Sequence, residues 1–214
     1  MKLRFPRLMC LTTDNSSFSH SEQVKELINS GADFIQLRTK KLEGEELFQE
    51  VQLANDYAVR NNTLLVVNDY VDVVQSTGAG GVHLGFNDSS FEYAMCTLGD
   101  RAIIGSTVHN LFEARIVKEK GLSSYVGLGP YRATTTKPDL ESTLSESEIY
   151  EIIEILSPIP IYLIGGIDIG DCGFISKFNI SGLAVCASLS SASCYGRYVR
   201  NFQKEIYNQE LIHS

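Results

Sequence analysis

The sequence predicts an α/β protein that folds as a (β/α)8 TIM barrel in a single domain spanning residues 1–214. Short β-rich apolar runs alternate with amphipathic stretches along the whole chain, which is typical of repeated βα units. Eight such units fit 214 residues, and 43% hydrophobic residues suffice for a sizeable core. An open doubly wound sheet is the alternative. It is disfavoured because no GxGxxG follows the first strand and because polar residues follow many strands instead of one crossover.

The expected elements follow from these local patterns. Strands are placed at Leu8 to Thr12, Phe34 to Leu37, Thr63 to Asn68, Gly81 to Leu84, Ala102 to Ser106, Tyr125 to Leu128, Ile161 to Ile164 and Gly182 to Ala187. Helices are placed at Glu22 to Asn29, Glu43 to Arg60, Val71 to Ser76, Phe91 to Leu98, Leu111 to Glu119, Ser145 to Leu156, Asp171 to Phe178 and Tyr195 to Gln209. In the second helix, Leu47, Val51 and Ala54 share one face at helical spacing. Gly78 and Gly121 precede strands, as glycines at helix C-termini do.

The composition narrows the classes of partner. A formal charge of -8 argues against a nucleic-acid binder, because affinity for phosphate backbones depends on clustered Lys and Arg. No apolar run approaches the roughly eighteen residues of a membrane span. The five cysteines lack CxxC spacing, so we interpret them as reduced thiols of a cytoplasmic protein. We expect small-molecule substrates, no nucleic acid and no membrane, and we leave room for a homo-oligomer.

In a barrel the functional residues lie at the carboxyl ends of the strands. After the second expected strand, alternation places Gln36, Arg38 and Lys40 on one face. Cations and an amide in this position are suited to a phosphorylated ligand. Solvated charges at the end of a strand are the alternative.

Two carboxylates follow neighbouring strands. Asp69 comes with Asn68 directly after an apolar run, and Asp88 follows the fourth strand. Each could be a helix N-cap. Together they favour Mg2+, which commonly takes one or two protein carboxylates and completes its octahedron with water and substrate phosphate.

A phosphate site is predicted where the sixth strand runs into a glycine- and hydroxyl-rich segment. Glycines allow close approach of the backbone, the hydroxyls are short donors, and the lysine adds a compact cation. The residues are Gly127, Gly129, Thr134, Thr135, Thr136 and Lys137. A solvated Thr-rich loop is the alternative. Gly166 follows the seventh strand, and Cys186 and Ala187 end the eighth, where barrels usually hold phosphate with backbone amides.

Two histidines are candidate acids or bases. For His83, at the end of the fourth strand, a packed and hydrogen-bonded role is favoured. His109 follows the hydroxyls of Ser106 and Thr107 in a loop, so both roles stay open. Zinc chemistry and a hydrolase triad are unsupported, because there is neither a Cys/His cluster nor a GxSxG elbow.

Taken in order, five motifs resemble the thiamine phosphate synthase family. They are Gln36-x-Arg38-x-Lys40, Asn68-Asp69, Val82-His83-Leu84-Gly85-x-x-Asp88, Gly127-x-Gly129-Pro130 with Thr134-x-Thr136-Lys137, and Ile164-Gly165-Gly166-Ile167. The family is a (β/α)8 barrel that joins hydroxymethylpyrimidine diphosphate to thiazole phosphate and releases pyrophosphate.

The resemblance implies a role for each matching residue. Gln36, Arg38, Lys40 and Asn68 would hold the pyrimidine diphosphate, Asp69 and Asp88 would bind Mg2+, and Thr107 and Lys137 would complete the diphosphate site. Thr134, Thr135, Thr136 and Gly166 would hold the thiazole phosphate, beside the backbone of Cys186 and Ala187. Arg38, Lys40 and Lys137 would stabilise the departing pyrophosphate in a dissociative substitution.

The chain departs from the family pattern in three places. Val108 stands where the family usually has a second hydroxyl, Thr39 replaces an acidic residue, and Cys186-Ala187 replaces Ile-Ser, although Ser188 is adjacent. Two other functions remain open. A thiazole tautomerase of the same fold would use His109 as base, and a non-catalytic barrel would only bind a phosphorylated metabolite.

Overall fold

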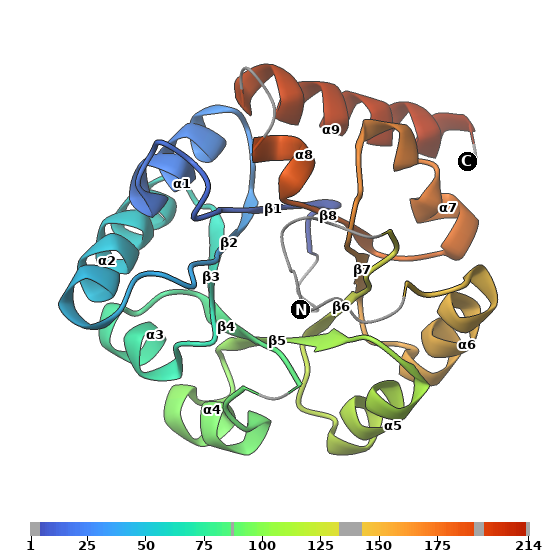
Figure 1. Ribbon diagram of the computed structural model, residues 1–214, viewed down its shortest axis with the longest axis horizontal. Coiled ribbons are helices and arrows are strands. Elements are labelled where there is room, and N and C mark those ends of the chain that lie inside the picture. Colours follow the sequence, from blue (N-terminus) through green and yellow to red (C-terminus); the bar gives the residue numbers. More distant parts are fainter. Residues whose placement is uncertain (1–4, 87, 133–142, 191–194, 213–214) are drawn as a thin grey trace.

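The computed structural model describes residues 5–86, 88–132, 143–190 and 195–212. Within them eight parallel strands close into a barrel in chain order, and β8 pairs back onto β1 (Figure 1). The strands are β1 (Leu8–Leu11), β2 (Phe34–Leu37), β3 (Leu64–Asn68), β4 (Gly81–Leu84), β5 (Ile103–Val108), β6 (Tyr125–Leu128), β7 (Ile161–Leu163) and β8 (Gly182–Val185). The prediction of a (β/α)8 barrel is confirmed.

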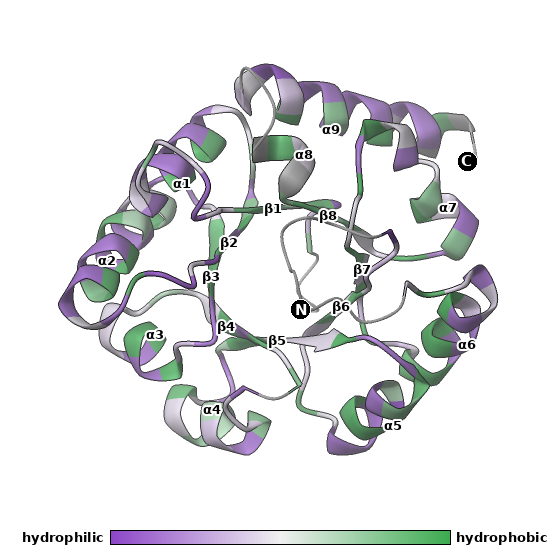
Figure 2. Cartoon of the chain, viewed as in Figure 1, coloured by the Kyte–Doolittle hydropathy of each residue, from purple (hydrophilic) through white to green (hydrophobic). Residues whose placement is uncertain are grey.

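Helices surround the barrel and turn their apolar faces towards it (Figure 2). They are α1 (His20–Asn29), α2 (Gly44–Arg60), α3 (Val71–Thr77), α4 (Phe91–Leu98), α5 (Leu111–Lys120), α6 (Glu146–Leu156), α7 (Phe174–Phe178), α8 (Ala187–Ser190) and α9 (Tyr195–Ile212), with a 3-10 turn η1 (Ile169–Asp171). Among the described helices none is long and apolar enough to cross a membrane.

Two expected elements are built differently. The helix predicted from Asp171 to Phe178 is wrong at its start, because the Asp168 side chain accepts the Gly170 N–H at 2.8 Å and begins η1, and α7 follows as a separate helix. The strand predicted to reach Ala187 ends at Val185, since Val185 with Cys10 is the last paired position between β8 and β1. Ala187 instead begins α8.

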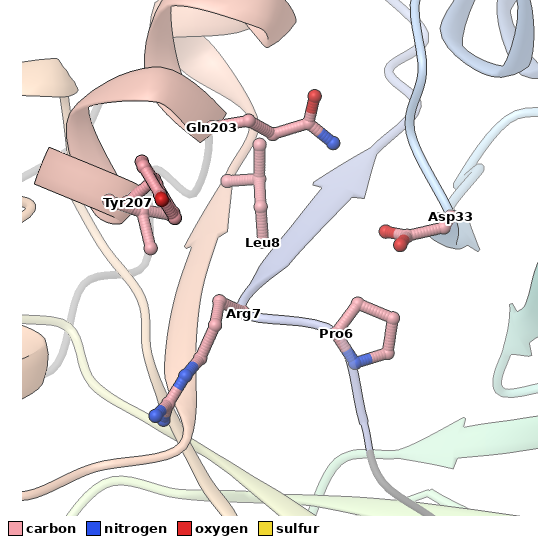
Figure 3. Close-up of a pocket in the computed structure, with 7 residues that line it drawn as sticks. Pro6, Arg7, Leu8, Asp33, Gln203 and Tyr207 are labelled. Carbon is pink, nitrogen blue, oxygen red and sulfur yellow. The ribbon is translucent and has the colours of Figure 1, made fainter. Parts of the chain in front are cut away.

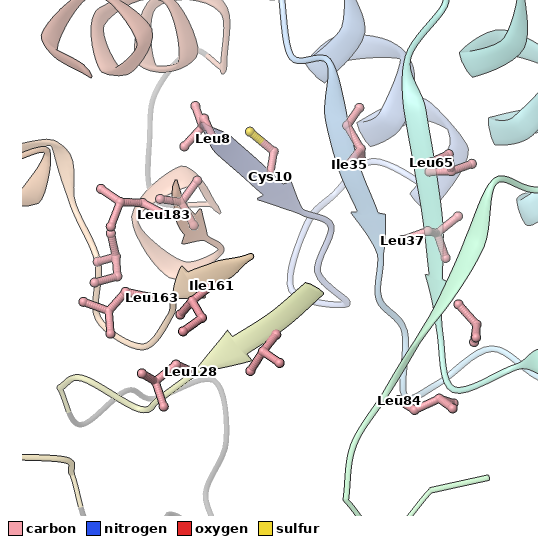
Figure 4. Close-up of a cluster of buried hydrophobic side chains, with 14 of the residues drawn as sticks. Leu8, Cys10, Ile35, Leu37, Leu65, Leu84, Leu128, Ile161, Leu163 and Leu183 are labelled. Carbon is pink, nitrogen blue, oxygen red and sulfur yellow. The ribbon is translucent and has the colours of Figure 1, made fainter. Parts of the chain in front are cut away.

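Successive residues of a strand face opposite sides of the barrel wall, which produces two apolar cores. Ile35 and Leu37 of β2 belong to the larger core between the strands and the helices, with Leu183 of β8 (Figure 4). Phe34 belongs with Met9 to the second core, inside the barrel. Each strand therefore reads as nearly continuously apolar, because both of its faces are covered.

Aromatic rings fill the interior at the amino ends of the strands. Phe34 lies 5.4 Å from the Tyr125 ring and 5.5 Å from the Tyr162 ring, both edge-on, and Phe5 lies 5.7 Å from Phe34. Gly105 makes room for this layer, because a Cβ there would lie 2.3 Å from Cζ of Tyr125. This end is packed with side chains, so the polar part of the interior lies towards the carboxyl ends.

Candidate active site

The carboxyl end of β3 presents an amide and a carboxylate at the rim. Asn68 closes the strand, and Asp69 follows with φ of +71°, a left-handed conformation that Asp adopts more readily than most residues. The Asp69 N–H donates to the carbonyl of His83 at 2.9 Å, which fixes Asp69 beside β4. Lys40, from the loop after β2, forms an ion pair with Oδ2 of Asp69. Three residues that the sequence singled out thus meet at one place.

Asp88 joins this group from the loop after β4, where it accepts the Gly85 N–H at 2.7 Å. Burial, and then the neighbouring carboxyl of Asp88, raise the pKa of Asp69 to about 6. Burial also acts to raise the pKa of Asp88, but the neighbouring Asp69 and the hydrogen bond from Gly85 outweigh it and hold the pKa of Asp88 below its usual value. Two carboxyl groups that compete for one proton in this way are suited to a shared cation.

The residues present fit a magnesium ion. Oδ1 of Asp69 is buried and has no hydrogen-bond partner among the described residues, so a cation would satisfy an atom that the protein leaves unpaired. No group of three or more His, Cys, Asp and Glu side chains in the described ranges is arranged to hold a metal. Two carboxylates, leaving the other positions to water and phosphate, match Mg2+ better than a metal that requires a full protein cage.

Arg38 brings positive charge to the same rim. It is half-buried, and its N–H donates to Oγ1 of Thr12 at 2.9 Å, which ties the end of β2 to β1. Burial raises the pKa of the Cys186 thiol, and the Arg38 guanidinium partly offsets this. Arg38 therefore lies near Cys186, which follows β8.

Beneath the rim, polar groups from β2, β4, β5 and β6 lie inside the barrel. Gln36 is 3% exposed and His83 is 6% exposed. His83 lies 2.9 Å from the Tyr125 hydroxyl through Nδ1 and 2.8 Å from Thr107 Oγ1 through Nε2. The expectation that His83 is packed and hydrogen-bonded agrees with this geometry, and Thr107 is connected to it.

His109 is held by its own helix. Its Nδ1 lies 3.0 Å from Oε2 of Glu113, and its N–H donates to the same oxygen at 2.8 Å. Burial acts to raise the pKa of Glu113, but its hydrogen bonds with His109 lower it further than burial raises it. Both contacts fix His109 at the start of α5, an orientation that suits a structural role better than that of a base.

The sequence did not identify Arg132 as a functional residue, nor its ion pair with Asp171. The Arg132 guanidinium donates to both carboxylate oxygens of Asp171, at 2.6 and 2.7 Å, and to the carbonyl of Gly166 at 2.8 Å. It also lies 4.8 Å from the centre of the Tyr131 ring. We call these contacts the Arg132 clamp. The only sequence signal was a lone arginine between the glycines and threonines after the sixth strand.

The clamp holds a turn of two glycines at the end of β7. Gly165 and Gly166 have φ of +100° and +64°, which glycine adopts readily and other residues rarely do. A Cβ on Gly166 would lie 2.7 Å from Cβ of Arg132. The carbonyls of Gly165 and Gly166 both accept hydrogen bonds from Arg132, the first from its backbone N–H and the second from its guanidinium.

At the end of β8, Ser188 does not replace the hydroxyl that the family pattern has there. Its hydroxyl donates to the carbonyl of Ile167 at 2.8 Å and accepts from the Tyr198 hydroxyl at 2.7 Å. Cys186 follows the last residue of β8, and Ala187 is the first residue of α8. Val108 packs in the outer core, since β5 alternation turns it away from the interior.

The expected phosphate residues Thr134, Thr135, Thr136 and Lys137 lie outside the described residues. A cavity of about 240 Å³ is described, but it lies at the other end of the barrel (Figure 3). Residues that precede β1 and β2, including Arg7 and Asp33, line it together with Tyr207 of α9. None of the predicted site residues lines this cavity. The amino ends of barrel strands usually contribute to stability, whereas the active site lies at the carboxyl ends.

Fold and rim together define a class: a (β/α)8 barrel whose carboxyl end combines a carboxylate pair, cations and a glycine turn suited to a phosphorylated substrate. A family described as thiamine monophosphate synthase matches residues 8–189. The chain belongs to this family. The predicted thiamine phosphate synthase, a transferase, is thereby confirmed at the level of the family.

Individual relatives agree with this assignment. The thiamine-phosphate synthase of Dictyoglomus thermophilum is 33% identical, over 86% of this chain and 83% of that protein. That of Flavobacterium johnsoniae is 27% identical, over 97% of this chain and all of the relative. The solved thiamine phosphate pyrophosphorylase of Pyrococcus furiosus superposes with a TM-score of 0.83 at 26% identity, covering 95% and 96% of the two chains.

Proposed function

We propose that this chain joins hydroxymethylpyrimidine diphosphate to thiazole phosphate, or to its carboxylated form, by dissociative substitution at carbon. The pyrimidine supports a cation at its exocyclic methylene, so the protein has little covalent chemistry to do. Its tasks are to hold the two substrates together, to stabilise the departing pyrophosphate and to exclude water.

Asp69 and Asp88 are the residues that would hold Mg2+. When bound, the ion would neutralise charge on the diphosphate and its leaving oxygen. The observation that carries the proposal is the carboxylate pair itself, with one buried oxygen of Asp69 left unpaired and Lys40 beside it. Such a pair has no function in a tautomerase, which binds no diphosphate, and it is costly in a barrel that only binds a metabolite.

The cations around this pair would hold the diphosphate. Lys40 forms an ion pair with Asp69 and would also bind a phosphate oxygen of the diphosphate. Arg38, directly after β2, would supply a second cation. Gln36, Asn68 and Thr107 would supply neutral hydrogen bonds, and Lys137 a further cation. We assign the catalytic effect to Arg38, Lys40 and Lys137, since charge develops on the leaving pyrophosphate in the transition state.

The thiazole phosphate would lie between the ends of β7 and β8. The amides of the Gly165-Gly166 turn and the backbone at Cys186 and Ala187 are its proposed donors, with Thr134, Thr135 and Thr136. This position is remote from the reacting nitrogen, so contacts there would hold the substrate equally before and during reaction. The compartment we propose is the cytoplasm.

Release of pyrophosphate from the pyrimidine diphosphate, measured with and without thiazole phosphate, tests the function. We expect release that depends on both the second substrate and Mg2+. Conversion of a thiazole phosphate tautomer without pyrophosphate release would instead establish the tautomerase. Binding of thiazole phosphate with neither reaction would establish a non-catalytic barrel.

A further inference from the structure

A chain of polar groups runs through the barrel beneath the rim, from β6 through β4 to β5. Its members are Tyr125, His83 and Thr107. The Tyr125 side chain is fully buried, and its hydroxyl lies 2.9 Å from Nδ1 of His83, whose Nε2 lies 2.8 Å from Oγ1 of Thr107. Thr107 is half-buried and lies nearest the open end.

Two glycines hold this chain in place. A Cβ on Gly105 would lie 2.5 Å from the Tyr125 hydroxyl oxygen, and a Cβ on Gly127 would lie 3.4 Å from Cε1 of His83. The two rings lie 5.5 Å apart between centres. Because β5 and β6 carry no side chain at these positions, the tyrosine and histidine rings lie directly against backbone and have little room to turn.

The direction of the hydrogen bonds begins at Tyr125. Its side chain is fully buried, and Nδ1 of His83, 2.9 Å away, is the one acceptor recorded for its hydroxyl among the described residues. A buried hydroxyl hydrogen without an acceptor is costly, so the Tyr125 hydroxyl donates to Nδ1 of His83.

This assignment determines the rest of the chain. With Nδ1 accepting, a neutral His83 carries its hydrogen on Nε2 and donates it to Oγ1 of Thr107. The opposite tautomer would leave the buried Tyr125 hydrogen without an acceptor, which is costly in an apolar interior. It would also direct the Thr107 hydrogen down to the histidine.

We infer that Tyr125 and His83 form a directional hydrogen-bond relay that turns the Thr107 hydroxyl into a donor facing the substrate diphosphate. Tyr125 and His83 are positioning residues, since they act through Thr107. A phosphate oxygen accepts hydrogen bonds and donates none, so only the tautomer with hydrogen on Nε2 gives Thr107 a useful contact. The inference rests on the proposed function for the identity of the ligand, but the direction of the relay does not.

The direct test is the tautomer of His83 in the unliganded protein, read from 15N and 13C chemical shifts of the four histidines, with His83→Gln used for assignment. Hydrogen on Nε2 is the expected result. Hydrogen on Nδ1, or a doubly protonated ring, overturns the relay. This measurement requires no turnover, so it distinguishes failure of the relay from failure of the proposed synthase activity.

The kinetic test is a double-mutant cycle of Tyr125→Phe and Thr107→Val. Each change should lower kcat/KM for the pyrimidine diphosphate by about tenfold to a hundredfold, the equivalent of one hydrogen bond to a charged group. The double variant should lose little more than either single one. Additive losses would mean that the two residues act separately and would overturn the relay.

Controls distinguish the relay from a general effect of altering the core. Tyr162→Phe removes another buried hydroxyl, which donates to the Pro6 carbonyl at the opposite end, and should change neither the His83 tautomer nor kcat/KM. Thr107→Ser keeps the hydroxyl and should recover most of the kcat/KM that Thr107→Val loses. The KM for thiazole phosphate should stay the same in all four single variants. A rise confined to that constant would mean that Thr107 contacts thiazole phosphate instead of the diphosphate.

Discussion

The two halves of the barrel rim present their ligand groups in different ways. From β2 to β4 the groups are charged side chains, in which Lys40 meets Asp69 and Asp88 supplies the second carboxylate. From β7 to β8 they are backbone groups on a glycine turn that the Arg132 clamp holds from outside.

The difference matches what each half is proposed to do. Charge develops on a leaving pyrophosphate, so groups there must interact more strongly with the transition state than with the substrate, and charged side chains with a metal provide this. A phosphate that is only held needs amides at fixed positions. The chain has a net charge of -8, so most of it repels an anion. Cations concentrated on one half of the rim create a local positive region that attracts the diphosphate.

Changes to the carboxylates should have the largest effect. Asp69→Ala or Asp88→Ala should lower kcat by about a thousandfold or more, on the order of 4 kcal/mol, because the metal would lose one of its two protein ligands. The melting temperature of the Asp69 variant should change little, since removal of a buried oxygen without a partner offsets the loss of the Lys40 ion pair and of the side chain that tolerates φ of +71°. Full turnover in the presence of EDTA would show that the reaction does not require Mg2+.

Gly166→Ala should be next, through strain. A residue with a Cβ is disfavoured at φ of +64°, and the new atom would lie 2.7 Å from Cβ of Arg132, so we expect a loss of about 1–3 kcal/mol in unfolding free energy. KM for thiazole phosphate should rise while KM for the pyrimidine diphosphate stays constant. Gly78→Ala is the matched control, because φ there is +68° but nothing lies within 4 Å. If both variants raise KM alike, the turn has no special role.

Breaking the Arg132 clamp should have a smaller and more selective effect. Arg132→Met should raise KM for thiazole phosphate by about tenfold, near 1.4 kcal/mol, with kcat almost unchanged, because the contact acts on uniform binding. Arg132→Lys keeps the charge but not three simultaneous bonds, so it should restore little. Lys177→Met breaks the exposed ion pair with Glu146 in the same part of the barrel and should leave both KM values as they are. A fall in kcat as large as the rise in KM would place Arg132 at the reacting centre.

The smallest effect is expected at the opposite end of the barrel. Burial raises the pKa of Asp33, so its ionised form contributes nothing to stability and Asp33→Asn should change the unfolding free energy by less than about 0.5 kcal/mol. Turnover should be unaffected. Kinetics and thermal melting of this variant check both expectations. Altered kinetics would show that the cavity at that end communicates with the rim.

The sequence by itself determined the barrel and the places of its polar residues. Alternating apolar runs and amphipathic stretches are local patterns, and a parallel strand wall places every carboxyl end at one rim whatever the details of packing. The identities of Asp69, Asp88, Lys40 and Arg38 at strand ends were therefore readable in advance. The exact starts of short helices were harder to predict. Asp168 caps a 3-10 turn before the expected helix, and a short helix begins at Ala187.

Only the tertiary structure decided which of these residues act on one another. The pKa of Asp69 depends on burial and on a carboxyl from the next strand, and the clamp joins Arg132 to a residue 39 positions away. The relay joins residues of three strands through the barrel interior, where the sequence does not indicate which atoms face one another. Charge, burial and hydrogen-bond direction depend on neighbours in space, and those neighbours are fixed only when the barrel closes.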